Sequence, residues 1–326
     1  MSGAGMNEFE LIDLIRAECA LQRPDVRIGI GDDAAAIEVP PGYELVVCTD
    51  TLVAGRHFPL NTRPEDIGWK ALAVNLSDLA AMGATPRWFT LALTLPEIDH
   101  PWLQAFSTGL LTLAAENAIE LVGGDTTRGP LSMTLTVMGE IPKGKALRRD
   151  AAKTGEDIWV SGTLGDAALG LRCIQGRIAL TQTQRAYAVD RLERPQPRVE
   201  LGLRLRDLAS SAIDISDGLL ADLGHICERS RLGARIEYKC VPISSALRGQ
   251  DAAVITECAL AGGDDYELCF TAPPAARGAL AVISSDLGLA LTRVGTLLDA
   301  DGVTVIGENG QSLALTHSGY DHFAPT

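Results

Sequence analysis

Residues 70–84 read KALAVNLSDLAAMGA, and the apolar run that begins at Asp66 predicts a helix that ends at Gly83. A strand-like segment, ELVVC (44–48), precedes this helix, and a second one, WFTLALTL (88–95), follows it. Strands that alternate with a helix at this spacing are typical of a domain in which helices cover a sheet. The stretch therefore predicts an α/β fold for the first part of the chain.

The same alternation continues on both sides of this stretch. Composition turns polar near residues 150–156, which places a domain boundary there and predicts domains over 1–150 and 151–326. We expect the α/β class, or α+β with mixed sheets, in both domains. The further expected elements are helices over 7–20, 101–117, 199–209 and 218–230, a helix after TLGDAALGL (163–171), strands over 27–30, 131–141 and 234–240, a strand from DIWVSG (157–162), a strand-loop over 119–129, a polar stretch over 174–190 and a βαβ-like tail.

Composition excludes several classes of protein. The 326 residues carry a formal net charge of −14, and no basic patch of useful size stands out, so we expect no nucleic-acid surface. No run of 18 apolar residues and no signal-peptide pattern is present, so we expect no membrane span and a cytoplasmic location. The seven cysteines form no CxxC pair and predict reduced core thiols.

Candidate functional residues gather in six short segments that combine Gly with carboxylates next to apolar sequence. Asp and Gly are also the usual residues of strand-ending turns, so one such segment alone is weak evidence. Six of them, beside segments expected to be buried, leave several carboxylates without basic partners nearby. The segments are GIGDDAA (29–35), CTDT (48–51), NLSDLAAMG (75–83), GGDTTRG (123–129), DISDG (214–218) and GGDDYE (262–267).

Oxygen-rich carboxylate sets are the natural ligands of Mg²⁺. Several carboxylates would repel a polyphosphate, because two unit charges about 4 Å apart interact by roughly 4 kcal/mol at an effective dielectric constant near 20. Bridging metal ions reverse the sign of that interaction. The acidic segments therefore predict Mg²⁺ binding, and their charge is compatible with a polyphosphate such as ATP only through metal ions.

Two of the segments carry a more specific prediction. Asn75 and Asp78 are three residues apart on a helix and share a face among apolar neighbours, so Asp78 is a candidate ligand. In DISDG, Ser216 or Asp217 suits the N-cap of the following helix, and that helix start also suits a phosphate. TLGDAALGL offers a similar Gly-rich helix start.

Familiar nucleotide motifs are missing from the sequence. It contains neither GxxxxGK[ST] nor the Gly-rich loop, HRD and DFG set of protein kinases, and it has no GxGxxG that opens a helix. A nucleotide site in this chain must therefore have a different architecture.

The order GIGDDAA, TDTLVAGRHF, KALAVNLSDLAAMGA, GGDTTRG, SGTLGDAALGL, AIDISDGLLADLGHI, AGGDDYEL and GYDHF resembles the bacterial thiamine-monophosphate kinases, from about residue 7 to Phe323. These belong to the aminoimidazole-ribonucleotide-synthetase-like superfamily. The resemblance implies phosphorylation of thiamine monophosphate to thiamine diphosphate, with ATP as phosphoryl donor and several Mg²⁺ ions. It also implies a homodimer in which strands of the N-terminal domains form a shared barrel, with the active cleft between the domains.

The resemblance also implies roles for particular residues. The implied magnesium ligands are Asp33, Cys48 through its carbonyl, Thr49, Asp50, Asp78, Asp125, Asp214 and Asp217. The implied nucleotide contacts are Gly124, Asp125, Arg149 and Ser216. The implied contacts to thiamine monophosphate are His57, Asp264 and Tyr320. From the residues alone, His57 also fits a structural histidine, Arg149 a solvated surface residue, and Tyr320 an anchor for the tail.

The implied mechanism is direct in-line transfer, in which an acceptor phosphate oxygen attacks the γ-phosphorus. That oxygen is already ionised near neutral pH, so no residue is expected to act as a strong base. The alternatives are another ATP-using enzyme of the superfamily, or a non-catalytic regulator that binds magnesium or nucleotide. Formation of ADP and thiamine diphosphate distinguishes these alternatives.

Overall fold

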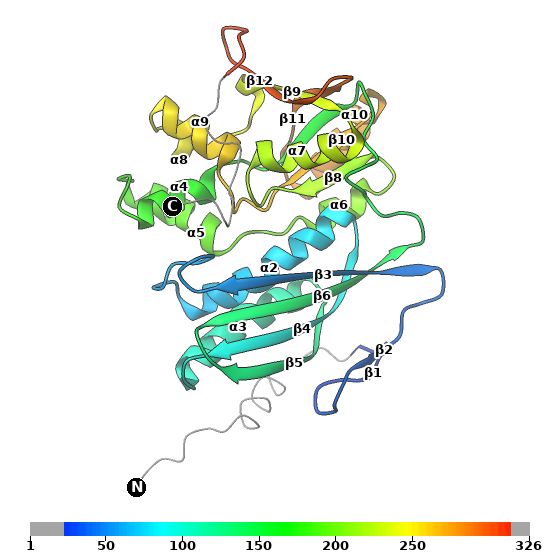
Figure 1. Cartoon of the computed structure of the whole chain (residues 1–326), viewed down its shortest axis with the longest axis vertical. Helices are drawn as coiled ribbons and strands as arrows, with labels where there is room; N and C mark the ends of the chain where they lie inside the picture. The colour runs from blue at the N-terminus through cyan, green and yellow to red at the C-terminus, as the bar shows by residue number, and fades with distance from the viewer. Residues whose placement is uncertain (1–22, 314–326) are drawn as a thin grey trace. The chain divides into compact units, whose positions relative to one another are not determined.

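The computed structural model describes residues 23–313, so the predicted helix over 7–20 and Tyr320 lie outside the described residues (Figure 1). The chain divides into two compact units. The first unit runs to Leu79 and resumes over Ala84–Gly144, and the second consists of Ala80–Gly83 and the chain from Lys145 onward.

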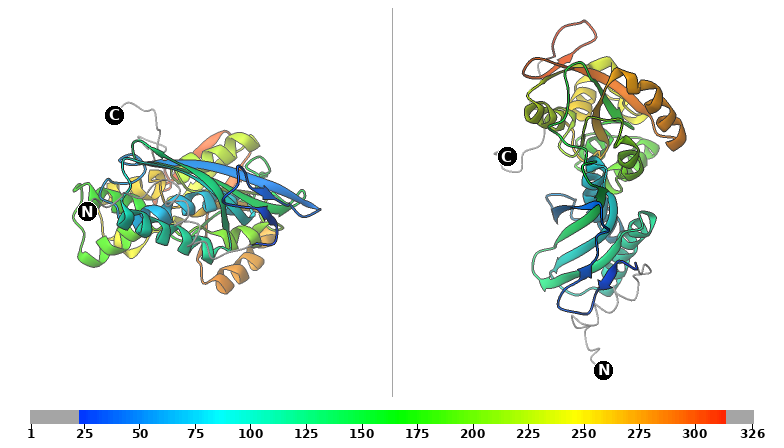
Figure 2. Two further views of the ribbon diagram at one scale, coloured as in Figure 1. Left: turned by 90° about the horizontal axis from the view of Figure 1, so that it is seen from below. Right: turned by 90° about the vertical axis from the view of Figure 1, so that its right-hand side faces the viewer.

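The first unit is a four-stranded sheet with helices on one face (Figures 1 and 2). Its elements are β1 (Val26–Ile28), β2 (Ala36–Ile37), β3 (Tyr43–Val53), α2 (Pro64–Met82), β4 (Thr85–Leu95), α3 (His100–Glu116), β5 (Glu120–Arg128) and β6 (Ser132–Pro142). The strand order is β3-β6-β4-β5, with β6 antiparallel to both neighbours and β4 parallel to β5. Strands β1 and β2 form a separate pair.

Helix α2 is buried along almost its whole length, as its apolar sequence predicts. It ends at Gly83, where φ is +68°. The N–H of Gly83 donates to the carbonyl of Ala80, and the N–H of Ala84 donates to the carbonyl of Leu79, at 2.9 and 2.8 Å. These two bonds form a Schellman motif, which satisfies the last carbonyls of the helix. The predicted helix end is confirmed.

Helices α2 and α3 approach each other closely through two glycines. A Cβ added at Gly109 would lie 1.8 Å from the carbonyl oxygen of Glu65, and one at Gly68 would lie 2.1 Å from that of Phe106. Both contacts are to backbone, which has little room to move. The close packing of the two helices therefore depends on the absence of side chains at these positions.

We expect Gly109→Ala to lower the free energy of unfolding by about 2 kcal/mol, because overpacking typically costs 1–3 kcal/mol and exceeds the gain of about 1 kcal/mol in helix propensity. Gly224 is a matched control, since it is also inside a helix but has no atom within 4 Å of an added Cβ. Gly224→Ala should stabilise the protein slightly. Urea unfolding measures both variants, and a Gly109→Ala protein as stable as the wild type would contradict the packing argument.

The second unit is built on a six-stranded mixed sheet of order β12-β9-β11-β7-β10-β8. Its strands are β7 (Asp157–Ser161), β8 (Ser211–Asp214), β9 (Gly233–Glu237), β10 (Leu268–Ala272), β11 (Leu291–Leu298) and β12 (Gly302–Ile306). Its helices are α4 (Asp166–Ile174), α5 (Gln182–Glu193), α6 (Val199–Leu205), α7 (Leu219–Ser230), α8 (Ser245–Arg248), α9 (Ala252–Ala261) and α10 (Arg277–Leu287), with short 3₁₀ turns η1 (Tyr238–Cys240) and η2 (Pro274–Ala276).

Alternate residues of the central strands enter two separate cores. Ile158 and Val160 of β7 lie in a core with α4, α7 and α9, whereas the intervening Trp159 packs on the core formed with α6 and α10. Successive residues of a strand point to opposite faces, so both faces of this sheet are covered. Strands β10 and β11 both run antiparallel to β7 and are joined through α10, which confirms the predicted βαβ arrangement.

Three expectations about local structure are wrong. Residues 119–129 are not a strand followed by a loop, because β5 continues through GGDTTR while paired with β4. The CTDT segment also lies inside a strand, since β3 pairs with β6 along its whole length. The polar stretch 174–190 contains α5, whose start is a capping box between Thr181 and Gln184.

The mixed α/β class is confirmed, and so is the burial of most cysteines. Cys173, Cys227, Cys258 and Cys269 are buried thiols, while Cys48 and Cys240 are partly exposed. Burial raises the pKa of Cys227 and of Cys258 to about 11, so these thiols are unreactive. Within residues 23–313, no helix is both long enough and apolar enough to cross a membrane.

Candidate active site

Strand β3 presents its predicted site residues to two different faces of the first unit's sheet. Cys48 and Asp50 are partly buried and point toward α2, where the Cys48 Sγ lies 3.4 Å from the Asn75 carbonyl oxygen. Thr49 and Thr51 are exposed on the opposite face, where each pairs with a threonine of β6, at 3.0 and 2.8 Å between hydroxyl oxygens. Alternation along the strand therefore separates Asp50 from Thr49.

The structure brings Asp50 of β3 together with Asp78 of α2. Burial raises the pKa of Asp50, and a side-chain hydrogen bond with Asp78 partly offsets this effect. Two carboxyl groups in contact cannot both remain ionised at low cost unless a proton or a cation lies between them. The sequence argument for Asp78 as a residue that faces a site is consistent with this geometry.

A divalent cation fits the Asp50–Asp78 pair by its chemistry, because oxygen ligands and excess negative charge are what Mg²⁺ prefers. Between residues 23 and 313, however, no group of three or more His, Cys, Asp or Glu side chains is assembled that could hold a metal ion. The remaining predicted ligands are spread over both units. The full ligand set thus stays a prediction.

Asp125 lies far from Asp50 within the sheet of one chain. Cross-strand pairing links Thr51 to Thr134, Thr134 to Ala92, and Ala92 to Asp125, so Asp125 shares the exposed face of Thr51. Strands β3 and β5 are three strand spacings apart, which is about 14 Å. One sheet therefore does not bring the two aspartates together.

Gly124 has a structural reason to be glycine. A Cβ at this position would lie 1.9 Å from the carbonyl oxygen of Leu91 on the neighbouring strand β4. This requirement is independent of the predicted nucleotide contact, which remains a prediction.

In the second unit, the segments DISDG and GGDDYE lie side by side. The N–H of Asp264 donates to the Ser216 carbonyl at 2.8 Å, and the N–H of Tyr266 donates to the Ile215 carbonyl at 2.8 Å. Gly263 permits this approach, because a Cβ there would lie 2.5 Å from the Ser216 oxygen. The structure thus brings together Ser216 and Asp264, which were predicted to contact nucleotide and substrate respectively.

Asp222, which was not among the predicted site residues, organises the DISDG segment. Its buried Oδ2 accepts hydrogen bonds from the N–H groups of Ser216, Asp217 and Gly218, each at 3.1 Å. Burial raises the pKa of Asp222 to about 8, and the neighbouring charges of Asp214 and Asp217 act in the same direction. The sequence signal for this role is an acidic residue in the first turn of the helix that follows DISDG.

This arrangement corrects the predicted helix cap. The N-cap of α7 is Gly218, with φ of +114° and no side-chain capping bond, rather than Ser216 or Asp217. The conformation of Gly218 excludes other residues, since a Cβ would lie 2.8 Å from the backbone of Ala261. Asp222 reaches back from the first turn of the helix and binds the N–H groups of the DISDG backbone that precedes it.

The Gly-rich start of α4 is already filled by a carboxylate of the chain itself. Asp265 accepts the N–H of Gly165 at 2.6 Å and that of Ala167 at 3.4 Å, and it is almost fully buried. Burial nevertheless raises the pKa of Asp265 well above its usual value. The suggestion that TLGDAALGL binds a phosphate is therefore not supported, because Asp265 uses these donors.

The structure also describes three further predicted residues, Asp33, Arg149 and His57. Asp33 is exposed between β1 and β2. The Arg149 carbonyl accepts from the Ser230 hydroxyl at the last residue of α7, about 18 Å along that helix from DISDG. His57 follows β3, and its Nδ1 accepts the Val53 N–H at 2.9 Å. Their predicted roles stay predictions.

A groove of about 980 Å³ lies along α7 and β12, and of the predicted site residues within 23–313 none lines it. Its wall includes His225, Glu228, Arg231 and Asp301 among apolar side chains. The groove is thus separate from the paired segments described above.

Family models match nearly the whole described chain. The AIR synthase related protein, N-terminal domain, matches residues 31–141, and the corresponding C-terminal domain matches residues 143–308. The thiamine-monophosphate kinase of Salmonella typhimurium is 50% identical over 97% of this chain and 98% of its own length.

Solved structures give the same result. The thiamine-monophosphate kinase of Stenotrophomonas maltophilia has a TM-score of 0.87 and 53% identity, over 94% of this chain and 98% of its own. The structure of AaThiL complexed with AMPPCP and TMP has a TM-score of 0.76 and 31% identity, over 97% of both chains. The predicted family is confirmed: this chain belongs to the AIR synthase related proteins and, among them, to the thiamine-monophosphate kinases.

Proposed function

We propose that this chain transfers the γ-phosphoryl group of ATP to thiamine monophosphate and so forms thiamine diphosphate. The observation that carries the proposal is the likeness to the AaThiL complex, which holds AMPPCP and TMP and is matched over 97% of this chain. The 50% identity to the kinase of Salmonella typhimurium supports the same activity.

The acceptor phosphate supplies its own ionised nucleophile, so catalysis depends on position and charge rather than on a base. Bound Mg²⁺ would neutralise charge on the transferred group. Asp50 and Asp78 are the two proposed ligands in direct contact, and their carboxylates suit such an ion by their chemistry. The further proposed ligands are Asp33, the Cys48 carbonyl, Thr49, Asp125, Asp214 and Asp217.

The proposed binding residues divide by substrate. For the nucleotide we propose Gly124, Asp125, Arg149 and Ser216, and for thiamine monophosphate His57, Asp264 and Tyr320. The contact between Ser216 and Asp264 supports binding of both substrates at adjoining segments. The predicted cytoplasmic location belongs to this proposal as well.

We also propose a homodimer formed through the sheet of the first unit. The sheet face opposite α2 exposes Leu45 and Val47 of β3, at 45% and 53% of their surface, beside Thr49 and Thr51. Apolar side chains in a row on a flat strand are typical of a surface that another chain covers. Sedimentation velocity at micromolar concentration would contradict the proposal if it found only monomers.

The test of function is a coupled assay of ADP formation with ATP, thiamine monophosphate and Mg²⁺. We expect turnover that requires all three and yields thiamine diphosphate. A panel of other phosphate acceptors distinguishes other ATP-using enzymes of the superfamily, and nucleotide binding without turnover would indicate a regulator. Failure to form thiamine diphosphate would overturn the proposal.

A further inference from the structure

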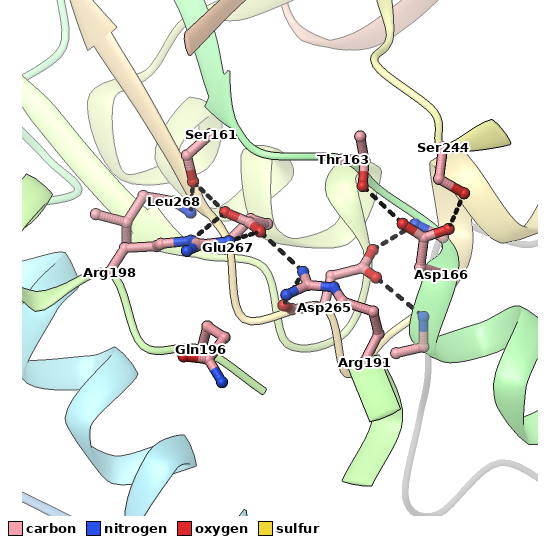
Figure 3. A network of polar contacts seen from close by, with 12 residues as sticks. Ser161, Thr163, Asp166, Arg191, Gln196, Arg198, Ser244, Asp265, Glu267 and Leu268 are labelled. Carbon is pink, nitrogen blue, oxygen red and sulfur yellow. Dashed lines mark hydrogen bonds and ion pairs between the residues drawn. The ribbon is translucent and has the colours of Figure 1, made fainter. Parts of the chain in front are cut away.

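Glu267 is a fully buried carboxylate held by two arginines from a separate part of the chain (Figure 3). Arg198 donates through Nε to Oε2 at 2.6 Å and through a second nitrogen to Oε1. Arg191 donates to Oε1 at 2.8 Å, and the Ser161 hydroxyl donates to Oε2 at 2.5 Å. Burial alone would raise the pKa of Glu267, but the arginines outweigh it and the pKa is lowered. Glu267 therefore stays ionised.

The same contacts fix the backbone of the GGDDYE segment. Arg191 also donates to the Asp265 carbonyl at 3.4 Å, and the Ser161 hydroxyl accepts the N–H of Leu268 at 2.9 Å. Gly162 lets the chain pass this close, because a Cβ there would lie 2.2 Å from the Glu267 carboxylate. Glu267 thus joins the end of β7, helix α5 and the segment before α6 to the start of β10.

Asp264, the proposed contact to thiamine monophosphate, has a left-handed backbone conformation that few non-glycine residues adopt. Its φ is +69°, and that of Tyr266 is +50°. Non-glycine residues keep such angles only where the surroundings impose them. The surroundings here are the inward-pointing carboxylates of Asp265 and Glu267, which alternate with Asp264 and Tyr266 along the segment.

We propose that Glu267, clamped by Arg191 and Arg198, is a positioning residue that holds Asp264 in its left-handed conformation, ready to contact the acceptor substrate. Glu267 acts through the backbone of the GGDDYE segment and needs no contact with a substrate. We call the contacts of Glu267 with Arg191 and Arg198 the clamp. The assignment of Asp264 to the acceptor rests on the proposed function, whereas the clamp rests on the contacts in Figure 3.

The test compares Glu267→Gln and Arg198→Lys with Asp157→Asn. Asp157 is a matched control, because it is also a buried carboxylate in the second unit's sheet and is paired with two arginines, Arg277 and Arg293. It lies at the other end of β7 from Ser161. Arg198→Lys keeps the charge and loses only the two-nitrogen contact, so it gives an answer even where Glu267→Gln fails to fold.

The first readout is the KM for each substrate in steady-state kinetics, measured after turnover by the wild-type protein has been established. We expect both clamp variants to raise KM for thiamine monophosphate by roughly 10-fold, since small misplacements of a binding group cost this much or more. KM for ATP should rise by a smaller factor, because the proposed nucleotide contact Ser216 is bonded to the Asp264 N–H. Asp157→Asn should leave both constants unchanged. Equal increases in both constants, or no increase in either, would overturn the proposal.

Hydrogen exchange gives a second readout that does not need activity. The N–H groups of Asp264 and Tyr266 are bonded to Ser216 and Ile215, so release of the segment should speed their exchange in the clamp variants and not in Asp157→Asn. Unchanged exchange at both positions would show that Glu267 does not hold the segment. If the wild-type protein lacks the kinase activity, the proposed function fails. Hydrogen exchange at Asp264 and Tyr266 still shows whether Glu267 holds the segment.

Discussion

Asp50→Asn should lower kcat by roughly 100-fold or more at ordinary Mg²⁺ concentration, because even residues that only support a metal ligand cost 10- to 100-fold. The same change should make the metal-free protein more stable. Burial raises the pKa of Asp50, so its ionised carboxylate works against folding at neutral pH, and a neutral amide removes that cost of desolvation. Loss of activity with a gain in stability is the signature of a site built for a ligand.

Two measurements separate this outcome from simple damage to the fold. Mg²⁺ should raise the melting temperature of the wild type, by an amount equivalent to about 2.7 kcal/mol at 100 times Kd, and should raise that of Asp50→Asn much less. Asp66→Asn is the matched control, since Asp66 is a buried carboxylate of the same unit, paired with Arg63. It should keep the wild-type kcat. Wild-type turnover in Asp50→Asn would contradict the ligand assignment.

Sequence patterns predicted the elements whose burial is uniform. Helix α2 is mostly apolar, is buried along almost its whole length and ends at a glycine, so its presence and its end could both be predicted. Helix α5 could not be found in the same way, because it is polar and only Ala188 and Leu192 are buried. The sequence feature that indicates α5 is the capping box of Thr181 and Gln184 at its start, rather than a periodic pattern of apolar residues.

Acidic motifs were predicted at strand ends, and two of them proved to lie within strands. Gly and Asp are unfavourable in strand interiors, so the sequence favoured turns for CTDT and GGDTTRG. Cross-strand pairing along β3 and β5 overrides that local preference. The position of Asp50 next to Asp78 depends on this pairing, because it sets which residues of β3 face α2.

Residues that support the site were missed for a different reason. The partners of Glu267 lie 69 and 76 residues away in sequence, so no local pattern links them. The partners of Asp222 are backbone N–H groups, so its only sequence signal is an acidic residue in the first turn of the helix, which does not identify what it binds. The family resemblance supplied the proposed ligands of magnesium and substrates, but the groups that position them had to come from the three-dimensional contacts.

Asp222→Ala is expected to reduce the free energy of unfolding by about 3 kcal/mol, because three N–H groups lose their acceptor at about 1 kcal/mol each. The DISDG segment would lose the side chain that orders it, so kcat should also fall by roughly 10-fold or more. Urea unfolding and the ADP assay measure the two effects. An alanine variant with wild-type stability and turnover would show that the segment is ordered without Asp222.

Asp222→Asn is the variant that isolates the cause. Asparagine keeps a carbonyl oxygen of similar position, which is able to accept from Ser216, Asp217 and Gly218, and it is neutral beside Asp214 and Asp217. Since the pKa of Asp222 is raised to about 8, the wild-type carboxyl is itself mostly neutral at pH 7, and the amide is a close substitute for it. We therefore expect near wild-type stability and turnover from Asn. If Asn were as damaging as Ala, the negative charge of Asp222 would be essential, and the acceptor oxygen alone would not explain how this segment is held.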